Sequence, residues 1–449
     1  MSPKLRVPLY ASTFAGFEAG NHVSGKDFVT IGSLAKGGLS NAWGCGLARL
    51  SARDMAAYPF LVSDLEASIA TISQRIGISG GTNDDLSEYF GLDEYSQPPI
   101  SLDVLHTNLL QHYLKHRQKI NKHGMKLGRS RVAVLSQDMA SREHCHLSGN
   151  CLWGCKWHST YSSNDELPQL RRHNNFSERS GFVVDGLTQY DGYWGVEGDS
   201  RLSGRQTLTA HQVILAAGTL ATTRLVLKTL KYKHPVSMQS CPTAAFLLWL
   251  PRRLGLQRAP GFGLGQLSFV LDLANNITAF GSTFATTGIT MSEFARYLPL
   301  SRRYAIDLLR GLLSTCVVGN LFLPGQFTQA EVQLREDMSL CVSGAYHADV
   351  DSLMKASAKV LRKAYRHMGA ILLPGSFRIG RPGSDIHYAA TLPMRASPRI
   401  GETSKFGEVK GLDGVYVVDG ACLPTLSEKS HTLTLMANAD RIGRQLAAI

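Results

Sequence analysis

The chain has 449 residues, 43 of them glycine and none in a low-complexity tract, so it can bury one or two hydrophobic cores. Its formal net charge of +12 comes from scattered lysines and arginines, and without basic runs we do not expect nucleic-acid binding. Eight cysteines exclude a disulfide scaffold, no signal peptide opens the sequence, and no apolar stretch approaches the ~20 residues of a membrane-spanning helix. We therefore expect a globular, cytoplasmic protein.

The first patterned stretch is a possible strand at Phe28–Ile31, which leads to a glycine-rich turn at Gly37–Gly46. Glycines and small side chains there can bring backbone amides close to an anionic or flat ligand. An ordinary connection between a strand and a helix would have the same composition. A third interpretation is a hydrolase nucleophile elbow at Ser40, because Asp419 and His431 follow in the chain order of a catalytic triad.

Two segments combine histidines with other possible metal ligands. The helical stretch Leu102–Lys122 contains His106, His112 and His116, but no carboxylate accompanies them on that side, and the pattern favours a solvated helix surface. The segment His144–His158 holds three thiols, at Cys145, Cys151 and Cys155, whose spacing matches neither zinc ribbons nor ferredoxins. We expect no metal site in this protein.

The clearest element of the first half is the apolar strand Val213–Leu215, which breaks at Ala217-Gly218 and continues as a helix over 220–230. This is the pattern of a buried parallel strand that leads to a helix N-terminus, where doubly wound folds commonly bind a cofactor. Other expected elements are helices at 62–76 and 351–368, a hairpin at 181–197, and strands at 266–273, 277–284, 330–334 and 340–342.

The stretch Met291–Thr315 mixes leucines and aromatic residues with arginines. An interfacial membrane helix has this composition. A partly buried helix whose arginines reach out to solvent has it as well, and the general pattern favours that second interpretation. Membrane association is therefore a possibility that we do not favour.

Two histidines stand on either side of a short strand near the C-terminus. His387 precedes the strand Val415–Val418, which stops at Asp419-Gly420, and His431 opens the final helix. A neutral imidazole with a pKa near 6.5 is suited to remove a hydroxyl proton at physiological pH. The arrangement indicates a catalytic site.

These motifs, in this order, resemble the glucose–methanol–choline (GMC) oxidoreductases. The resemblance spans residues 30–449 and rests most specifically on His387-x-x-x-Thr391 and on Val417-Val418-Asp419-Gly420 followed by His431 and Ala437-Asn438-Ala439. The family has a glycine where this chain has Ala390.

The resemblance implies a flavoprotein that oxidises an alcohol, such as a sugar or another polyol, with FAD as hydride acceptor. In this interpretation His387 is the base and His431 holds the substrate oxygen. Residues expected to line the cofactor are Gly37, Gly38, Ser40, Asn41, Gly218, Asp419 and Gly420.

The implied fold is α/β with mixed α+β character: an incomplete Rossmann-like FAD-binding domain at 1–235 and 348–449, and a sheet-containing substrate domain at 236–347. The family opens with a strand and a Gly-x-Gly-x-x-Gly turn for the FAD pyrophosphate, and these residues do not occur here. Three alternatives stay open. The sequence lacks an N-terminal part, the missing half is a separate polypeptide, or this copy is a non-catalytic relative that no longer binds flavin normally.

Overall fold

The computed structural model describes residues 7–257, 259–286, 288, 289, 291, 295 and 298–448. The α-helices are α1 Ala11–Phe14, α2 Phe17–Gly20, α3 Glu66–Ile76, α4 Ser87–Phe90, α5 Val104–Asn121, α6 Leu167–Leu170, α7 Thr219–Thr229, α9 Arg302–Leu313, α10 Val350–His367 and α11 Thr432–Ala447. The strands are β1 Val23–Lys26, β2 Ile78–Ser79, β3 Ser96–Gln97, β4 Met125–Arg129, β5 Phe182–Tyr190, β6 Tyr193–Ser200, β7 Gly204–Ala210, β8 Val213–Leu215, β9 Val236–Met238, β10 Thr243–Trp249, β11 Gly265–Asp272, β12 Thr278–Ala285, β13 Cys316–Phe322, β14 Thr328–Leu334, β15 Leu340–Tyr346, β16 Ile371–Leu372, β17 Arg378–Ile379 and β18 Val415–Val417.

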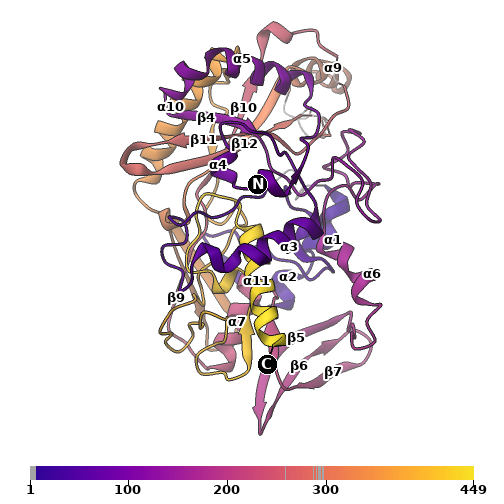
Figure 1. Cartoon of the computed structure of the whole chain (residues 1–449), viewed down its shortest axis with the longest axis vertical. Coiled ribbons are helices and arrows are strands. Elements are labelled where there is room, and N and C mark those ends of the chain that lie inside the picture. The colour runs from indigo at the N-terminus through magenta and orange to yellow at the C-terminus, as the bar shows by residue number, and fades with distance from the viewer. Residues whose placement is uncertain are drawn as a thin grey trace.

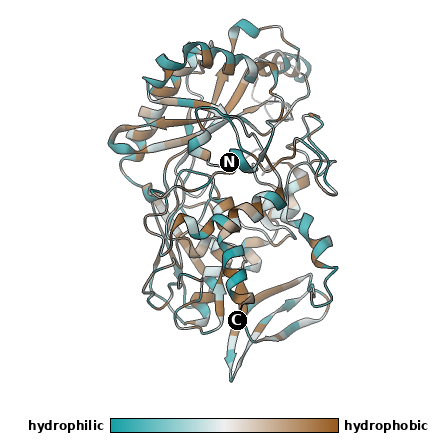
Figure 2. Cartoon of the chain, in the orientation of Figure 1, coloured by the Kyte–Doolittle hydropathy of each residue, from teal (hydrophilic) through white to brown (hydrophobic). Residues whose placement is uncertain are grey.

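The upper half of the molecule in Figure 1 is a seven-stranded sheet under two long helices. Its strand order is β16-β10-β13-β12-β11-β4, and β17 also pairs with β10. Apolar side chains of α5 and α10 form one core with this sheet, including Leu109, Phe269 and Tyr365. Hydrophilic and hydrophobic residues alternate along both helices in Figure 2, as in helices that pack one side on a sheet. The sheet takes β4 from outside the range expected for the substrate domain, and the domain boundaries stay a prediction.

The lower half is built around α7, α11 and the parallel pair β8–β18. Val415, Tyr416 and Val417 pair with Val213, Ile214 and Leu215. A second core of apolar side chains surrounds this pair and includes Leu225 of α7 and Leu433 of α11. The mixed α/β architecture predicted from the sequence is confirmed, and the strand at 213–215 leads to α7 as expected.

Two local predictions were wrong. The strand near the N-terminus is Val23–Lys26 and not 28–31, because residues 23–26 pair in parallel with residues 340–343 of β15. His106 does not lie on a solvated surface: it is fully buried, and both its backbone amide and its Nδ1 contact Asp103 Oδ1 at 2.8 Å. Asp103 thereby caps the N-terminus of α5. None of the helices in the described ranges is long and apolar enough to cross a membrane.

Candidate functional site

His387 and His431 lie in contact, although 43 residues separate them in the chain. His387 is in the loop after β17, and His431 is the N-cap residue of α11. Their ring centroids are 4.9 Å apart, and the ring planes cross at 78°. Phe322, the last residue of β13, lies 5.3 Å from the His387 ring. The pair therefore sits where the end of the upper sheet meets the lower half.

The backbone on both sides of His387 is strained. Ile386 has φ 64° and Ala390 has φ 68°, in the left-handed region that costs roughly 1–2 kcal/mol for a residue with a Cβ. A β-branched residue rarely adopts this conformation. Position 390 is the one where the GMC motif has glycine. Strain of this kind concentrates at functional sites, where the surrounding structure holds it in place.

Both imidazoles are neutral at physiological pH. Burial lowers the pKa of His387 to about 3, assisted by the charge of His431, and burial lowers the pKa of His431 to about 4. The Nδ1 atoms of both rings are buried without a hydrogen-bond partner among the described residues. The His387 side chain is still 27% exposed. The exposed part of the His387 ring thus gives the pair an open side, while both Nδ1 atoms face the interior.

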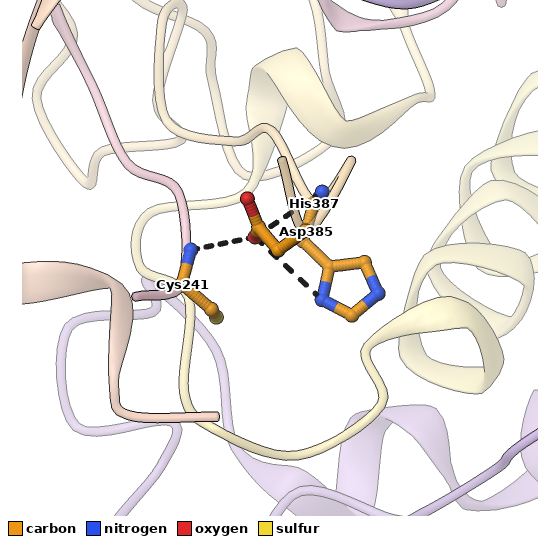
Figure 3. Close-up of side chains that lie close together, drawn as sticks. All are labelled: Cys241, Asp385 and His387. Atoms are coloured by element: carbon orange, nitrogen blue, oxygen red, sulfur yellow. Dashed lines mark hydrogen bonds and ion pairs between the residues drawn. The ribbon is translucent and has the colours of Figure 1, made fainter. Parts of the chain in front are cut away.

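Asp385 lies directly behind His387 (Figure 3). Its carboxylate is fully buried and accepts hydrogen bonds from Ser240 Oγ at 2.5 Å and from the Cys241 amide at 2.7 Å. The His387 amide donates to Oδ2 at 3.3 Å, and Oδ2 is 3.8 Å from His387 Nδ1. Burial raises the pKa of Asp385 to about 7. A carboxyl group that titrates near neutrality therefore stands beside the ring of His387, and Figure 3 shows the second ring nitrogen pointing away from it.

Asp419 follows β18 and connects the end of this strand to the start of α7 through hydrogen bonds. The Gly218 amide and the Thr222 hydroxyl donate to its Oδ2, and the Ala421 amide donates to its Oδ1 at 3.0 Å. Burial raises the pKa of this carboxyl to about 6. The structure thus brings Gly218, Asp419 and Gly420 together, and their role in lining a cofactor stays a prediction. The exposed backbone at residues 216–218 is the part of this edge that a ligand can reach.

Gly420 occupies a position with no room for a side chain. A Cβ there would lie 2.5 Å from Thr219 Oγ1 and 2.6 Å from the Tyr388 carbonyl oxygen. We expect Gly420→Ala to destabilise the protein by about 1–3 kcal/mol, because a backbone carbonyl must move to accommodate the methyl group. Gly443→Ala in α11 is the matched control: it meets nothing within 4 Å and should stabilise the helix by roughly 0.5–1 kcal/mol. Denaturant unfolding of the two variants measures both effects, and equal free energies of unfolding would contradict the close contact.

The glycine-rich segment at 37–41 packs against residues 162–163. Ser40 Oγ donates to the Gly37 carbonyl at 2.5 Å and contacts the Ser163 hydroxyl at 3.0 Å, while Asn41 Oδ1 accepts from Ser162 Oγ at 3.0 Å. A short 3-10 helix, η3, begins at Gly38 and ends at Asn41. Neither Asp419 nor His431 is a hydrogen-bond partner of Ser40, so the geometry does not support the serine hydrolase alternative.

The three-thiol segment contains no converging set of metal ligands. Among the residues that the structure describes, Cys241, Asp385 and His387 are the only group of three or more ligand atoms that lie within 4.8 Å of one another. Cys145, Cys151 and Cys155 line one small cavity with His146 and Trp157, but they do not form such a group.

The sequence interpretation missed the neighbours of His387. Asp385 is two residues away, yet nothing in the sequence showed that its carboxylate is buried. Ser240 and Cys241 lie in the connection between β9 and β10, and Phe322 ends β13, so these residues reach the site only through the tertiary fold.

Comparisons with known proteins point to one family. Residues 346–439, which contain both histidines, match the model of the C-terminal region of the GMC oxidoreductases. The search of curated proteins found no match. Pyridoxine 4-oxidase from Mesorbium loti has a similar fold, with a TM-score of 0.57 and 14% identity, over 93% of this chain and 85% of that one.

A second similar structure is an FAD-dependent oxidoreductase from Chaetomium thermophilum, determined in complex with a small-molecule fragment. Its TM-score is 0.59 at 13% identity, over 93% of this chain and 87% of that one. At these sequence identities, the similarity to the two solved structures shows the fold alone. The family match covers the residues that form the site. Residues 346–439 are therefore similar to the GMC oxidoreductases, and the two structures show the fold of the chain.

Proposed function

We propose that the protein is an FAD-dependent oxidoreductase that oxidises an alcohol. The observation that carries the proposal is the pair of neutral imidazoles, 4.9 Å apart, in which the His387 ring is partly exposed and has a buried carboxyl group behind it. The family match supports the reaction class, and the two similar structures include an oxidase of an alcohol-bearing compound and a protein named for its FAD dependence.

The described residues fit a flavin on the substrate side of the site. The partly exposed His387 ring provides an open side against which a flat ring system can lie. The exposed backbone at 216–218 lies at the break between β8 and α7, where a helix N-terminus favours anionic groups. Gly218, Asp419 and Gly420 would form this edge. Gly37, Gly38, Ser40 and Asn41 are proposed cofactor residues on family resemblance alone.

FAD, when bound, supplies the hydride acceptor that no amino-acid side chain provides. The remaining steps belong to the protein. His387 takes the proton of the substrate hydroxyl on its unprotonated ring nitrogen; because burial also weakens this ring as a base, the transfer needs a group that stabilises the imidazolium. His431 donates a hydrogen bond to the substrate oxygen and stabilises the negative charge that develops there. Asp385 lies close enough to His387 Nδ1 to stabilise the imidazolium that results.

The first test is binding of FAD to the purified full chain. We expect the protein to acquire the visible absorbance of an oxidised flavin on reconstitution and to bleach under anaerobic conditions with one member of an alcohol panel. The panel should contain sugars, polyols, primary aliphatic alcohols and pyridoxine. A reconstituted chain that retains no flavin after gel filtration would contradict the proposal. Absence of bleaching across the panel, with flavin bound, would refute alcohol oxidation for these substrates and leave the cofactor assignment standing.

A further inference from the structure

Helix α9 presents a row of apolar side chains to solvent at the upper right rim of the molecule (Figure 1). Tyr304, Leu308 and Leu312 are 68%, 44% and 40% exposed, and Ala305 is the only fully buried residue of this helix. Residues four positions apart lie above one another on the same side of a helix. Single exposed leucines are common on protein surfaces, but a continuous row requires an explanation.

The turn after β10 extends this row. Leu250 donates its amide hydrogen to the Thr315 carbonyl at 2.9 Å, which places the 3-10 turn η7, Pro251–Arg253, beside the C-terminal end of α9. Leu254, directly after the turn, is 65% exposed. The apolar side chains of α9 and of this turn therefore belong to one end of the molecule.

Positive charge lies on the other side of this helix and on the neighbouring turn. Arg302, Arg303 and Arg310 are exposed on α9, where Asp307 is the single acidic residue, and η7 contributes Arg252 and Arg253. None of these arginines forms a salt bridge with a residue in the described part of the chain.

Helix α5 adds to this charge. Burial lowers the pKa of His112, and the charges of His116, Lys115, Arg252 and Arg253 lower it further. Cationic groups of two helices and a turn thus lie at one end of the molecule.

We propose that α9 and the turn at 251–254 form a surface that binds a lipid bilayer with anionic headgroups, with α9 lying in the plane of the interface. A helix with an exposed apolar row on one side and arginines on another is typical of interfacial membrane binding. Its 12 residues span about 18 Å, which is too short to cross a bilayer. Of the stretch Met291–Thr315, residues 292–294, 296 and 297 lie outside the described residues, and the observed helix begins at Arg302.

The proposal is tested by flotation of the full chain with vesicles of phosphatidylcholine alone and of phosphatidylcholine with phosphatidylserine, at low and at high salt. We expect binding to the anionic vesicles and at least tenfold weaker binding to the neutral ones. Leu308→Ser/Leu312→Ser should weaken binding to anionic vesicles by about tenfold or more, because two apolar side chains no longer enter the interface. Arg302→Gln/Arg303→Gln should weaken it by about fivefold for each charge removed.

Leu61→Ser/Leu202→Ser is the matched control, since both leucines are exposed elsewhere, at 72% and 97%. This variant should bind vesicles like the wild type. The exposed positions of all these substitutions should leave thermal unfolding unchanged, which circular dichroism checks.

Three results would overturn the proposal. The first is failure of the wild type to float with anionic vesicles. The second is flotation that high salt abolishes and that the leucine substitutions on α9 leave unchanged, which would mean adsorption of a basic protein through charge alone. The third is a wild-type dimer on gel filtration that the α9 leucine variant dissociates, which would assign this surface to a second copy of the chain.

Discussion

Replacing His387 with alanine should lower the rate of flavin reduction by about 10²- to 10⁴-fold while FAD stays bound, because the group that takes the hydroxyl proton is lost. The His387 side chain is partly exposed, and the backbone amide of residue 387 can still donate its hydrogen bond to Asp385 in the variant. Anaerobic stopped-flow absorbance with the substrate identified from the alcohol panel measures the rate. Equilibrium absorbance measures the bound flavin.

His173→Ala is the control for this variant, since His173 is exposed and lies outside the site. It should reduce flavin at the wild-type rate. A His387→Ala variant that also kept the wild-type rate would show that another group takes the proton. His431→Asn provides a further comparison: asparagine retains a hydrogen-bond donor, so this variant should keep more activity than His431→Ala if position 431 binds the substrate oxygen.

Replacing Asp385 with asparagine should change the pH dependence of stability, independently of flavin or substrate. Burial raises the pKa of this carboxyl from 3.8 to about 7, so the folded state holds its proton at pH values where the unfolded state has released it. The contribution of this carboxyl group to the free energy of unfolding of the wild type is therefore fully present below about pH 4. It is lost as the pH rises through 7. Asparagine stays neutral, so the variant loses nothing over this range.

The expected size of the effect follows from the shift. About three pKa units at 1.36 kcal/mol each correspond to roughly 4 kcal/mol as an upper value for this fully buried side chain. The free energy of unfolding of Asp385→Asn minus that of the wild type should thus increase between pH 5 and pH 8, as denaturant titrations at several pH values would show. The variant Asp199→Asn, at an exposed carboxylate, should show no such trend. A difference that stays constant with pH would refute the raised pKa of Asp385.

Much of the local structure could be predicted from the sequence. The helical periodicity at 62–76 and 351–368 and the apolar strand at 213–215 gave elements within a few residues of the observed ones. The reason is that these patterns depend on neighbours within one or two turns, or on the alternation of a single strand. The final strand and the helix after His431 were predicted for the same reason. The resemblance to the GMC motif then suggested catalytic roles for the histidines beside them.

The tertiary structure alone decided which groups meet. The contact between His387 and His431, the burial of Asp385 against residues 240–241 and the pairing of β1 with β15 join segments separated by 43 to more than 300 residues. No local pattern encodes such distances, and burial, which sets the pKa of Asp385 and of both imidazoles, arises only when these segments pack together. The same holds for α9: its amphipathic sequence is compatible with a buried or a free helix, and the packing of the chain left its apolar row exposed.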